Sequence, residues 1–306
     1  MKTTPVTHAD LIGSVLAVPP LARHPDLTLN REANKKLIDH IESGGVRTLL
    51  YGGNANFYNI AISEYAEILD YLEESAGPDT WVIPSVGPDF GKMMDQAKIL
   101  RHRKFPAPMV LPLTFPSTDE GAADSIRRFS DEIGRPVVVY IKSTTFLQPD
   151  SVAALVSEGR VAAIKYAVVR ENPRKDDFLT ALLQQVAKSL VVSGIGERPA
   201  IIHLRDFGLS GFTSGSVCIG PRGSMALLKA IQSGRYDEAE HLQAAYMPLE
   251  DCRDSLSPIR VLHDAVTTAG IADMGPILPM LSRLDQQNLV QVGSVARALL
   301  AHDKSL

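Results

Sequence analysis

The stretch VAAIKYAVV, residues 161–169, decides how the rest of the chain is interpreted. Eight of its nine residues are apolar or aromatic, and the ninth is Lys165. An apolar run of this length is typical of a strand that is buried on both faces. Burying an unpaired charge is costly in free energy, so we expect Lys165 to be paired, neutral or chemically active.

Apolar, β-branched runs of similar length recur along the chain and alternate with longer amphipathic runs. The predicted strands are IGSVLAV (12–18), VRTLLY (46–51), WVIPSV (81–86), PMVLPL (108–113), PVVVYI (136–141), VAAIKYA (161–167), SLVVSG (189–194) and SGFTSG (210–215). The predicted helices are 31–44, 64–75 with Ser63 as its N-cap, 91–102, 120–133, 150–158, 176–188, 198–207 and 222–232. Strands and helices that alternate in this way predict a parallel sheet closed into a (β/α)8 barrel, the TIM-barrel fold.

The main alternative is an open, doubly wound sheet, which usually carries a glycine-rich phosphate turn after its first strand. Here the first predicted strand ends in Val18-Pro19-Pro20, and no such turn follows. Residues 1–232 are therefore expected to form the catalytic barrel. Residues 233–306 contain helical patterns and no strand candidate, so we expect a C-terminal helical region packed on the barrel.

Composition argues against several classes of protein. The net charge of −4 gives no electrostatic footprint for a nucleic-acid partner. No apolar run reaches the length of a membrane helix, although Lys2 before LIGSVLAVPPLA (11–22) leaves a targeting signal as an alternative to a first strand. Cys218 and Cys252 are too few for a disulfide framework, so a reduced, cytoplasmic setting is expected.

Sequence motifs for the common cofactors are missing. GIGERP (194–199) begins like a dinucleotide-binding turn but has proline where the last glycine should be, and neither GxxxxGK[ST] nor GxSxG occurs. The eight histidines are scattered, without HExxH or a His-x-His pair. We therefore predict neither a cofactor nor a metal.

Lys165 and Tyr140 are the candidate catalytic residues. Active sites of barrels lie at the C-terminal ends of the strands, and both residues lie toward those ends of neighbouring predicted strands. Burial can lower the pKa of a lysine by up to about 3–5 units. The neutral amine can then form a Schiff base with a ketone, while a nearby phenol transfers protons. The alternative is a lysine that reaches from the strand end to solvent, and the adjacent tyrosine favours chemistry.

Several segments together resemble the dihydrodipicolinate synthase / N-acetylneuraminate lyase family. The segments are PVVVYIKSTT (136–145), VAAIKYA (161–167), DHIESGGVRTLLYGGNANFYNIAISEYAEIL (39–69), SGFTSGSVCIGP (210–221) and GRYDEAEHLQAAYMPLEDC (234–252). The resemblance covers most of the chain. It implies a (β/α)8 barrel in which Lys165 is the Schiff-base lysine and Tyr140 is the proton-transfer tyrosine.

The resemblance also assigns a substrate-binding turn. The family's carboxylate-binding GTTGE falls on Gly52-Gly53-Asn54-Ala55-Asn56, which lacks the hydroxyls. Backbone N–H groups of Gly53 and Asn54 can still hold a carboxylate, with the Asn54 side-chain amide in place of a hydroxyl. A tight strand-to-helix turn explains the same residues, and the two interpretations are compatible. Thr213 and Ser214, at the end of the last strand, are expected to face the pocket.

Two departures from the family pattern argue against dihydrodipicolinate synthase itself. Thr145 stands where the synthase carries an arginine for its second substrate. Leu113 and Thr114 stand where tyrosines of the family would be, so the family's proton relay is expected to be broken. Lys142, two residues beyond the predicted catalytic tyrosine, either serves a different anionic substrate or points outward.

The sequence therefore predicts a metal-independent class I lyase, an aldolase or dehydratase that acts on pyruvate or a 2-keto-3-deoxy sugar acid. Its partner is a small 2-keto acid, and the resemblance implies a homo-oligomer, either a tetramer or a dimer. The altered GGNAN turn leaves open a family member that binds a keto acid or serves as a scaffold. The third interpretation is a barrel of unrelated chemistry, or an open α/β binding protein, in which Lys165 is structural.

Overall fold

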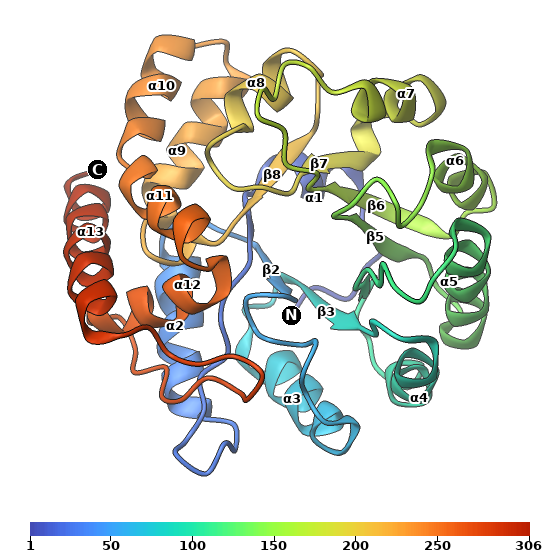
Figure 1. Cartoon of the computed structure of the whole chain (residues 1–306), viewed down its shortest axis with the longest axis horizontal. Helices are drawn as coiled ribbons and strands as arrows, with labels where there is room; N and C mark the ends of the chain where they lie inside the picture. The colour runs from blue at the N-terminus through green and yellow to red at the C-terminus, as the bar shows by residue number, and fades with distance from the viewer.

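Eight parallel strands close into a barrel in the computed structural model, which describes residues 1–306 (Figure 1). Each strand pairs with the next one along the chain, and the first strand also pairs with the last, where Leu16 lies opposite Thr213. This closure confirms the predicted (β/α)8 fold and excludes the open sheet.

The order of elements follows the predicted alternation. The strands are β1 (Leu16–Ala17), β2 (Thr48–Tyr51), β3 (Trp81–Val86), β4 (Met109–Val110), β5 (Val137–Ile141), β6 (Val161–Tyr166), β7 (Val191–Ser193) and β8 (Gly211–Ser214). The helices are α1 (His8–Gly13), α2 (Arg31–Ser43), α3 (Ile62–Ser75), α4 (Phe90–Leu100), α5 (Asp119–Ile133), α6 (Pro149–Ser157), α7 (Asp177–Gln185), α8 (Ala200–Arg205), α9 (Pro221–Gln232), α10 (Tyr236–Ala244), α11 (Met247–Ser255), α12 (Pro258–Thr268) and α13 (Gln286–Ser305). Two 3₁₀ turns, Lys188–Leu190 and Ser216–Cys218, flank β7 and β8.

The strands form the centre of the core because helices cover their outer face. Every residue of β2 and β3 is buried, including Trp81 at the start of β3, as expected for a parallel sheet enclosed by helices. The surrounding helices are amphipathic. For example, α2 buries Leu37, Ile38 and Ile41 and leaves its charged residues on the other face. None of the helices combines the length and the apolar character needed to cross a membrane.

The start of the chain differs from the prediction. The predicted strand 12–18 is wrong in its first part, because those residues end α1 and only Leu16–Ala17 pair as β1. Asp10 explains the early helix. Its carboxylate accepts hydrogen bonds from the Thr7 backbone N–H at 2.8 Å and from the Thr7 hydroxyl at 2.9 Å, which fixes the first turn.

The predicted N-cap at Ser63 is also wrong. Helix α3 begins two residues earlier than predicted, at Ile62, and Ala61 occupies the N-cap position. Glu64 supplies the capping interaction instead, because its carboxylate accepts a hydrogen bond from the Ala61 backbone N–H at 3.0 Å.

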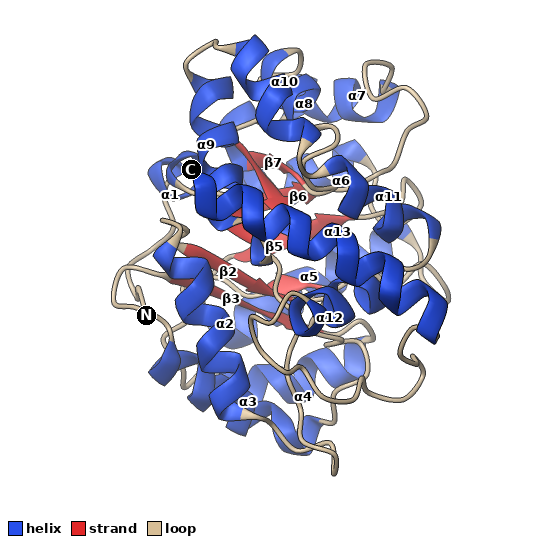
Figure 2. Cartoon of the chain, turned by 90° about the vertical axis from the view of Figure 1, so that its left-hand side faces the viewer, coloured by secondary structure: helices blue, strands red, loops and turns tan.

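Four further helices, α10 to α13, follow the last barrel helix. The long α13 lies along the outside of the molecule, where it contacts α9, α11 and α12 (Figure 2). Residues between Glu250 and Ile259, from the end of α11 and the start of α12, line a cavity at the C-terminal end of the barrel. The expected division into domains of residues 1–232 and 233–306 stays a prediction.

Candidate active site

Lys165 and Tyr140 lie side by side on β6 and β5. The two strands pair so that Tyr140 is directly opposite Lys165. The Nζ atom of Lys165 lies 4.4 Å from the centroid of the Tyr140 ring, and the lysine is only 5% exposed. The structure therefore brings together the two residues that the sequence singled out.

Burial changes the protonation of Lys165. Burial and, to a smaller extent, the positive charges of Lys142 and Arg253 together lower the pKa of the amine to about 7. No carboxylate acts in the opposite direction. The lysine is therefore neither paired with an anion nor extended into solvent, and a large fraction of it is a neutral amine near pH 7.

Two phenols, those of Tyr140 and Tyr58, line the same cavity as this amine. Burial raises the pKa of Tyr140, and the neighbouring Tyr58 raises it further. Burial likewise raises the pKa of Tyr58 to about 12. Both phenols therefore keep their protons at neutral pH and can donate hydrogen bonds to a bound molecule.

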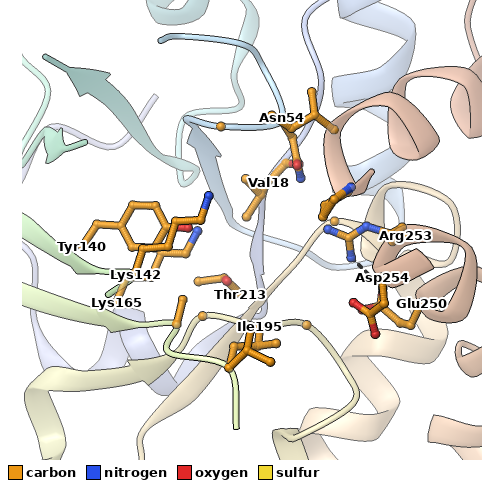
Figure 3. A pocket seen from close by; sticks show the side chains of 18 of the residues that line it. Val18, Asn54, Tyr140, Lys142, Lys165, Ile195, Thr213, Glu250, Arg253 and Asp254 are labelled. Carbon is orange, nitrogen blue, oxygen red and sulfur yellow. Dashed lines mark hydrogen bonds and ion pairs between the residues drawn. The ribbon is translucent and has the colours of Figure 1, made fainter. Parts of the chain in front are cut away.

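A cavity of about 250 Å³ opens at the end of the barrel where the strands finish. Lys165 and Lys142 reach into it from one side and Arg253 from the opposite side, with Thr213 between them (Figure 3). Active sites of barrel enzymes lie at this end. The cavity is large enough for a small organic acid and carries more positively charged groups than the sequence analysis assigned.

The predicted carboxylate-binding turn follows β2 and lines the same cavity. Gly53 and Asn54 both contribute to its wall. The side-chain amide of Asn54, however, donates a hydrogen bond to the backbone carbonyl of Val18 at 2.8 Å. One of its two hydrogens thus fixes the turn against the end of β1, which leaves the other hydrogen for a ligand.

The two predicted residues of β8 point in opposite directions. Thr213 lines the cavity, whereas Ser214 is not among the lining residues. The Ser214 hydroxyl instead accepts a hydrogen bond from the Val217 backbone N–H at 2.9 Å. Successive side chains of a strand alternate between its faces, so only one of two neighbours can face the site. Lys142, for which the sequence left two orientations open, lines the cavity.

Arg253 and Glu250 of α11 are site residues that the sequence analysis missed. Arg253 Nη1 donates a hydrogen bond to Glu250 Oε1 at 2.6 Å, and the same carboxylate accepts one from the Ser216 hydroxyl. Arg253 is 11% exposed and Glu250 2%. The spacing of three residues places both on one face of the helix, but this pattern is equally common on exposed helices.

A second carboxyl, Glu197, lies in the loop after β7. Its Oε1 accepts a hydrogen bond from the Ser224 hydroxyl at 2.6 Å, while Oε2 has no partner. Burial and, to a smaller extent, the charge of Glu250 together raise the pKa of Glu197 to about 7. No group of three or more His, Cys, Asp or Glu side chains is placed to hold a metal ion.

Comparison with known proteins shows what the chain is similar to in sequence and fold. A probable 5-dehydro-4-deoxyglucarate dehydratase of Acinetobacter baumannii is 21% identical over 282 residues, which cover 88% of this chain and 90% of that protein. Among solved structures, a dihydrodipicolinate synthase of Oceanobacillus iheyensis superposes with a TM-score of 0.83 at 18% identity, covering 95% of this chain and 99% of the other. A sialic acid aldolase of Ruminococcus gnavus superposes with a TM-score of 0.82 at 16% identity, covering 96% and 99%.

The structural likenesses, at such low identity, concern the fold. The sequence model of the dihydrodipicolinate synthetase family matches residues 13–298, which is nearly the whole chain. The low identities to individual proteins indicate a divergent sequence. The chain therefore belongs to the dihydrodipicolinate synthetase family.

Proposed function

We propose that the protein is a metal-independent class I lyase in which Lys165 forms a Schiff base with a 2-keto acid. The observation that carries the proposal is a buried amine with a pKa of about 7, beside Tyr140, in the cavity at the C-terminal end of the barrel. Such a pKa is what a nucleophilic lysine needs, because only the neutral amine attacks a carbonyl.

The reaction follows from this arrangement. The Lys165 amine attacks the keto carbon to give a carbinolamine, and the Tyr140 phenol protonates the departing hydroxyl, which leaves as water. The resulting iminium withdraws electrons from the neighbouring carbon. Loss of a proton there gives an enamine that can expel a hydroxide from the next carbon, which is dehydration. If the bond between that neighbouring carbon and the next carbon breaks instead, the hydroxyl on the next carbon gives its proton to the Tyr140 phenolate. The products are the enamine of pyruvate on Lys165 and an aldehyde, which is aldol cleavage.

A 2-keto-3-deoxy sugar acid is the substrate class that we favour, with pyruvate as the simplest ligand. The dehydratase named among the relatives supports this class. Thr145 stands where the synthase carries its substrate-binding arginine, which argues against dihydrodipicolinate synthesis. Thr213 and Lys142 in the cavity provide a hydroxyl and a positive charge for a longer, oxygenated substrate.

Borohydride trapping tests the proposal. The protein is incubated with pyruvate and reduced with sodium borohydride, and the mass of the intact chain and of its peptides is measured. We expect one reduced pyruvyl adduct, located on Lys165, and we expect it to persist in Lys142→Ala and to vanish in Lys165→Ala. Absence of an adduct with pyruvate and with longer 2-keto acids contradicts the proposal. Substrates are then sought among deoxy sugar acids and aldol partners.

One observation favours a second candidate, a family member that binds a keto acid without turning it over. The GGNAN turn lacks hydroxyls, and the Asn54 amide is partly engaged by Val18. A trapped adduct on Lys165 without turnover across the substrate panel supports this candidate.

For both candidate functions we propose that the protein is a homo-oligomer, either a tetramer or a dimer, and light scattering measures its mass in solution. We also propose a cytoplasmic location.

A further inference from the structure

We propose that Arg253 binds the carboxylate that adjoins the keto carbon of the substrate. The inference rests on the proposed function and adds a residue to it, one supplied by the C-terminal helices and not by a barrel strand. Arg253 lies near the end of α11 and reaches the cavity opposite Lys165 (Figure 3). A keto acid between the two residues would present its carbonyl to the amine and its carboxylate to the guanidinium.

Gly215 shows how close Arg253 comes to the predicted carboxylate-binding turn. A Cβ atom added at Gly215 would lie 2.8 Å from Arg253 Nη2 and 3.0 Å from Asn54 Nδ2. The guanidinium and the Asn54 amide therefore both pack closely over Gly215, where no side chain would fit, and all three residues line the same wall of the cavity. Two neighbouring groups with N–H donors in the lining of one cavity suit the two oxygens of a carboxylate.

Hydrogen bonds within the protein orient the guanidinium without using all of its donors. Arg253 Nη1 donates to Glu250 Oε1 at 2.6 Å, and the Ser216 hydroxyl holds the same carboxylate. Nη2 makes no hydrogen bond with the protein and is the Arg253 atom nearest to a Cβ placed at Gly215. Because Glu250 holds one edge of the side chain, the remaining donors are fixed in direction before a ligand arrives.

This role explains how the site can bind a carboxylate although the turn lacks hydroxyls. Asn54 gives one amide hydrogen to Val18, so the turn offers few neutral donors. A carboxylate that enters a buried cavity loses its hydration, and neutral donors alone compensate for that loss less well than a charged donor does. The positive charge of Arg253 supplies the compensation that the family obtains elsewhere.

The test compares pyruvate, which carries a carboxylate at this position, with its uncharged methyl ester. Trapping on Lys165 is measured at increasing concentrations of pyruvate and of methyl pyruvate, whose ester has no negative charge. The half-saturating concentration is determined for each in the wild type, in Arg253→Gln and in Arg253→Lys. The measurements are made at pH 9, where the lysine amine is neutral in every variant, so that a change in its pKa does not enter the comparison.

We expect Arg253→Gln to raise the half-saturating concentration of pyruvate by about 10- to 100-fold, as for the loss of a charged hydrogen bond, and to leave that of methyl pyruvate nearly unchanged. The half-saturating concentration of pyruvate for Arg253→Lys should lie between the values for the wild type and Arg253→Gln. The matched control is Arg198→Gln. Arg198 pairs with Asp251 and Asp254, which lie on the same helix as Arg253, but Arg198 itself does not line the cavity. The inference is overturned if Arg253→Gln changes the half-saturating concentrations of both ligands equally, or leaves that of pyruvate unchanged.

Two further measurements separate this result from its alternatives. Arg253→Gln leaves the buried Glu250 without its cation, so Glu250→Gln/Arg253→Gln is tested in parallel, with circular dichroism to confirm the fold. The double variant should lose the preference for pyruvate over methyl pyruvate to the same extent as Arg253→Gln. Failure of the proposed function looks different, because the wild-type protein then forms no adduct on Lys165 with either ligand.

Discussion

Tyr140 lies directly opposite Lys165 in the β5–β6 ladder, so the phenol ring and the amine occupy the same side of the cavity. Backbone hydrogen bonds of the barrel fix this relationship, and it does not depend on a flexible loop. A proton donor held in this way next to a nucleophile suits the formation and breakdown of a carbinolamine.

Tyr140→Phe should slow the reaction without removing the nucleophile. The phenylalanine ring keeps the packing against Lys165, while the proton donor is lost. We expect the rate of adduct formation with pyruvate to fall by about 10²–10⁴-fold, as is common for the loss of a general acid or base. Quenched-flow borohydride trapping measures this rate. The final yield of adduct on Lys165 should remain close to that of the wild type, and an unchanged rate would remove Tyr140 from the mechanism.

The pH dependence of activity should report the low pKa of Lys165. Below about pH 7 the amine is mostly protonated, so kcat/KM should fall about tenfold for each unit of pH. Lys142→Met removes a neighbouring positive charge that lowers this pKa, so the acid limb of the profile should move to higher pH. The profile of Lys98→Met, which changes an exposed lysine on α4, should match that of the wild type. An acid limb that stays in place in Lys142→Met contradicts this coupling.

Lys165 should also be unfavourable for stability. Its pKa falls from 10.5 in the unfolded chain to about 7 in the folded protein, so the unfolded state binds more protons between these values. The loss of folding stability that Lys165 causes is therefore complete below pH 7 and disappears as the pH rises toward 10.5. Lys165→Met should increase the free energy of unfolding by about 3–5 kcal/mol at pH 6 and by less at pH 9. Urea denaturation at both pH values measures the difference, and a variant less stable than the wild type at pH 6 would show that the charged lysine has a favourable partner.

Particular residues show what the sequence could predict. Lys165 and Tyr140 were recognisable because a charged or phenolic side chain interrupts an apolar strand, and neighbouring strands of a barrel run in register. Arg253 was not recognisable. Its helix is amphipathic and charged, like many helices on a surface, and only the packing of α11 against the barrel turns that face inward. Ser214 could not be separated from Thr213 for a related reason, since the exact register of a short strand decides which neighbour faces the cavity.

Glu197 should make stability depend on pH in the direction opposite to Lys165. Its pKa rises from 4.5 in the unfolded chain to about 7 in the folded protein, so the folded state binds more protons between these values. Stability should therefore decrease as the pH rises from about 5 to 8. Glu197→Gln, which keeps the shape without the charge, should stabilise the protein by about 2–3 kcal/mol at pH 8 and have little effect at pH 5.

Urea denaturation of Glu197→Gln at pH 5 and pH 8 measures this effect, with the exposed Glu240→Gln on α10 as the matched control. The control should change stability little at either pH. If Glu197→Gln instead destabilises the protein equally at both pH values, the carboxylate is charged in the folded state and is stabilised by Arg253. That outcome would mean that Arg253 is balanced by two carboxylates, Glu250 and Glu197, and would leave less of its charge for a substrate.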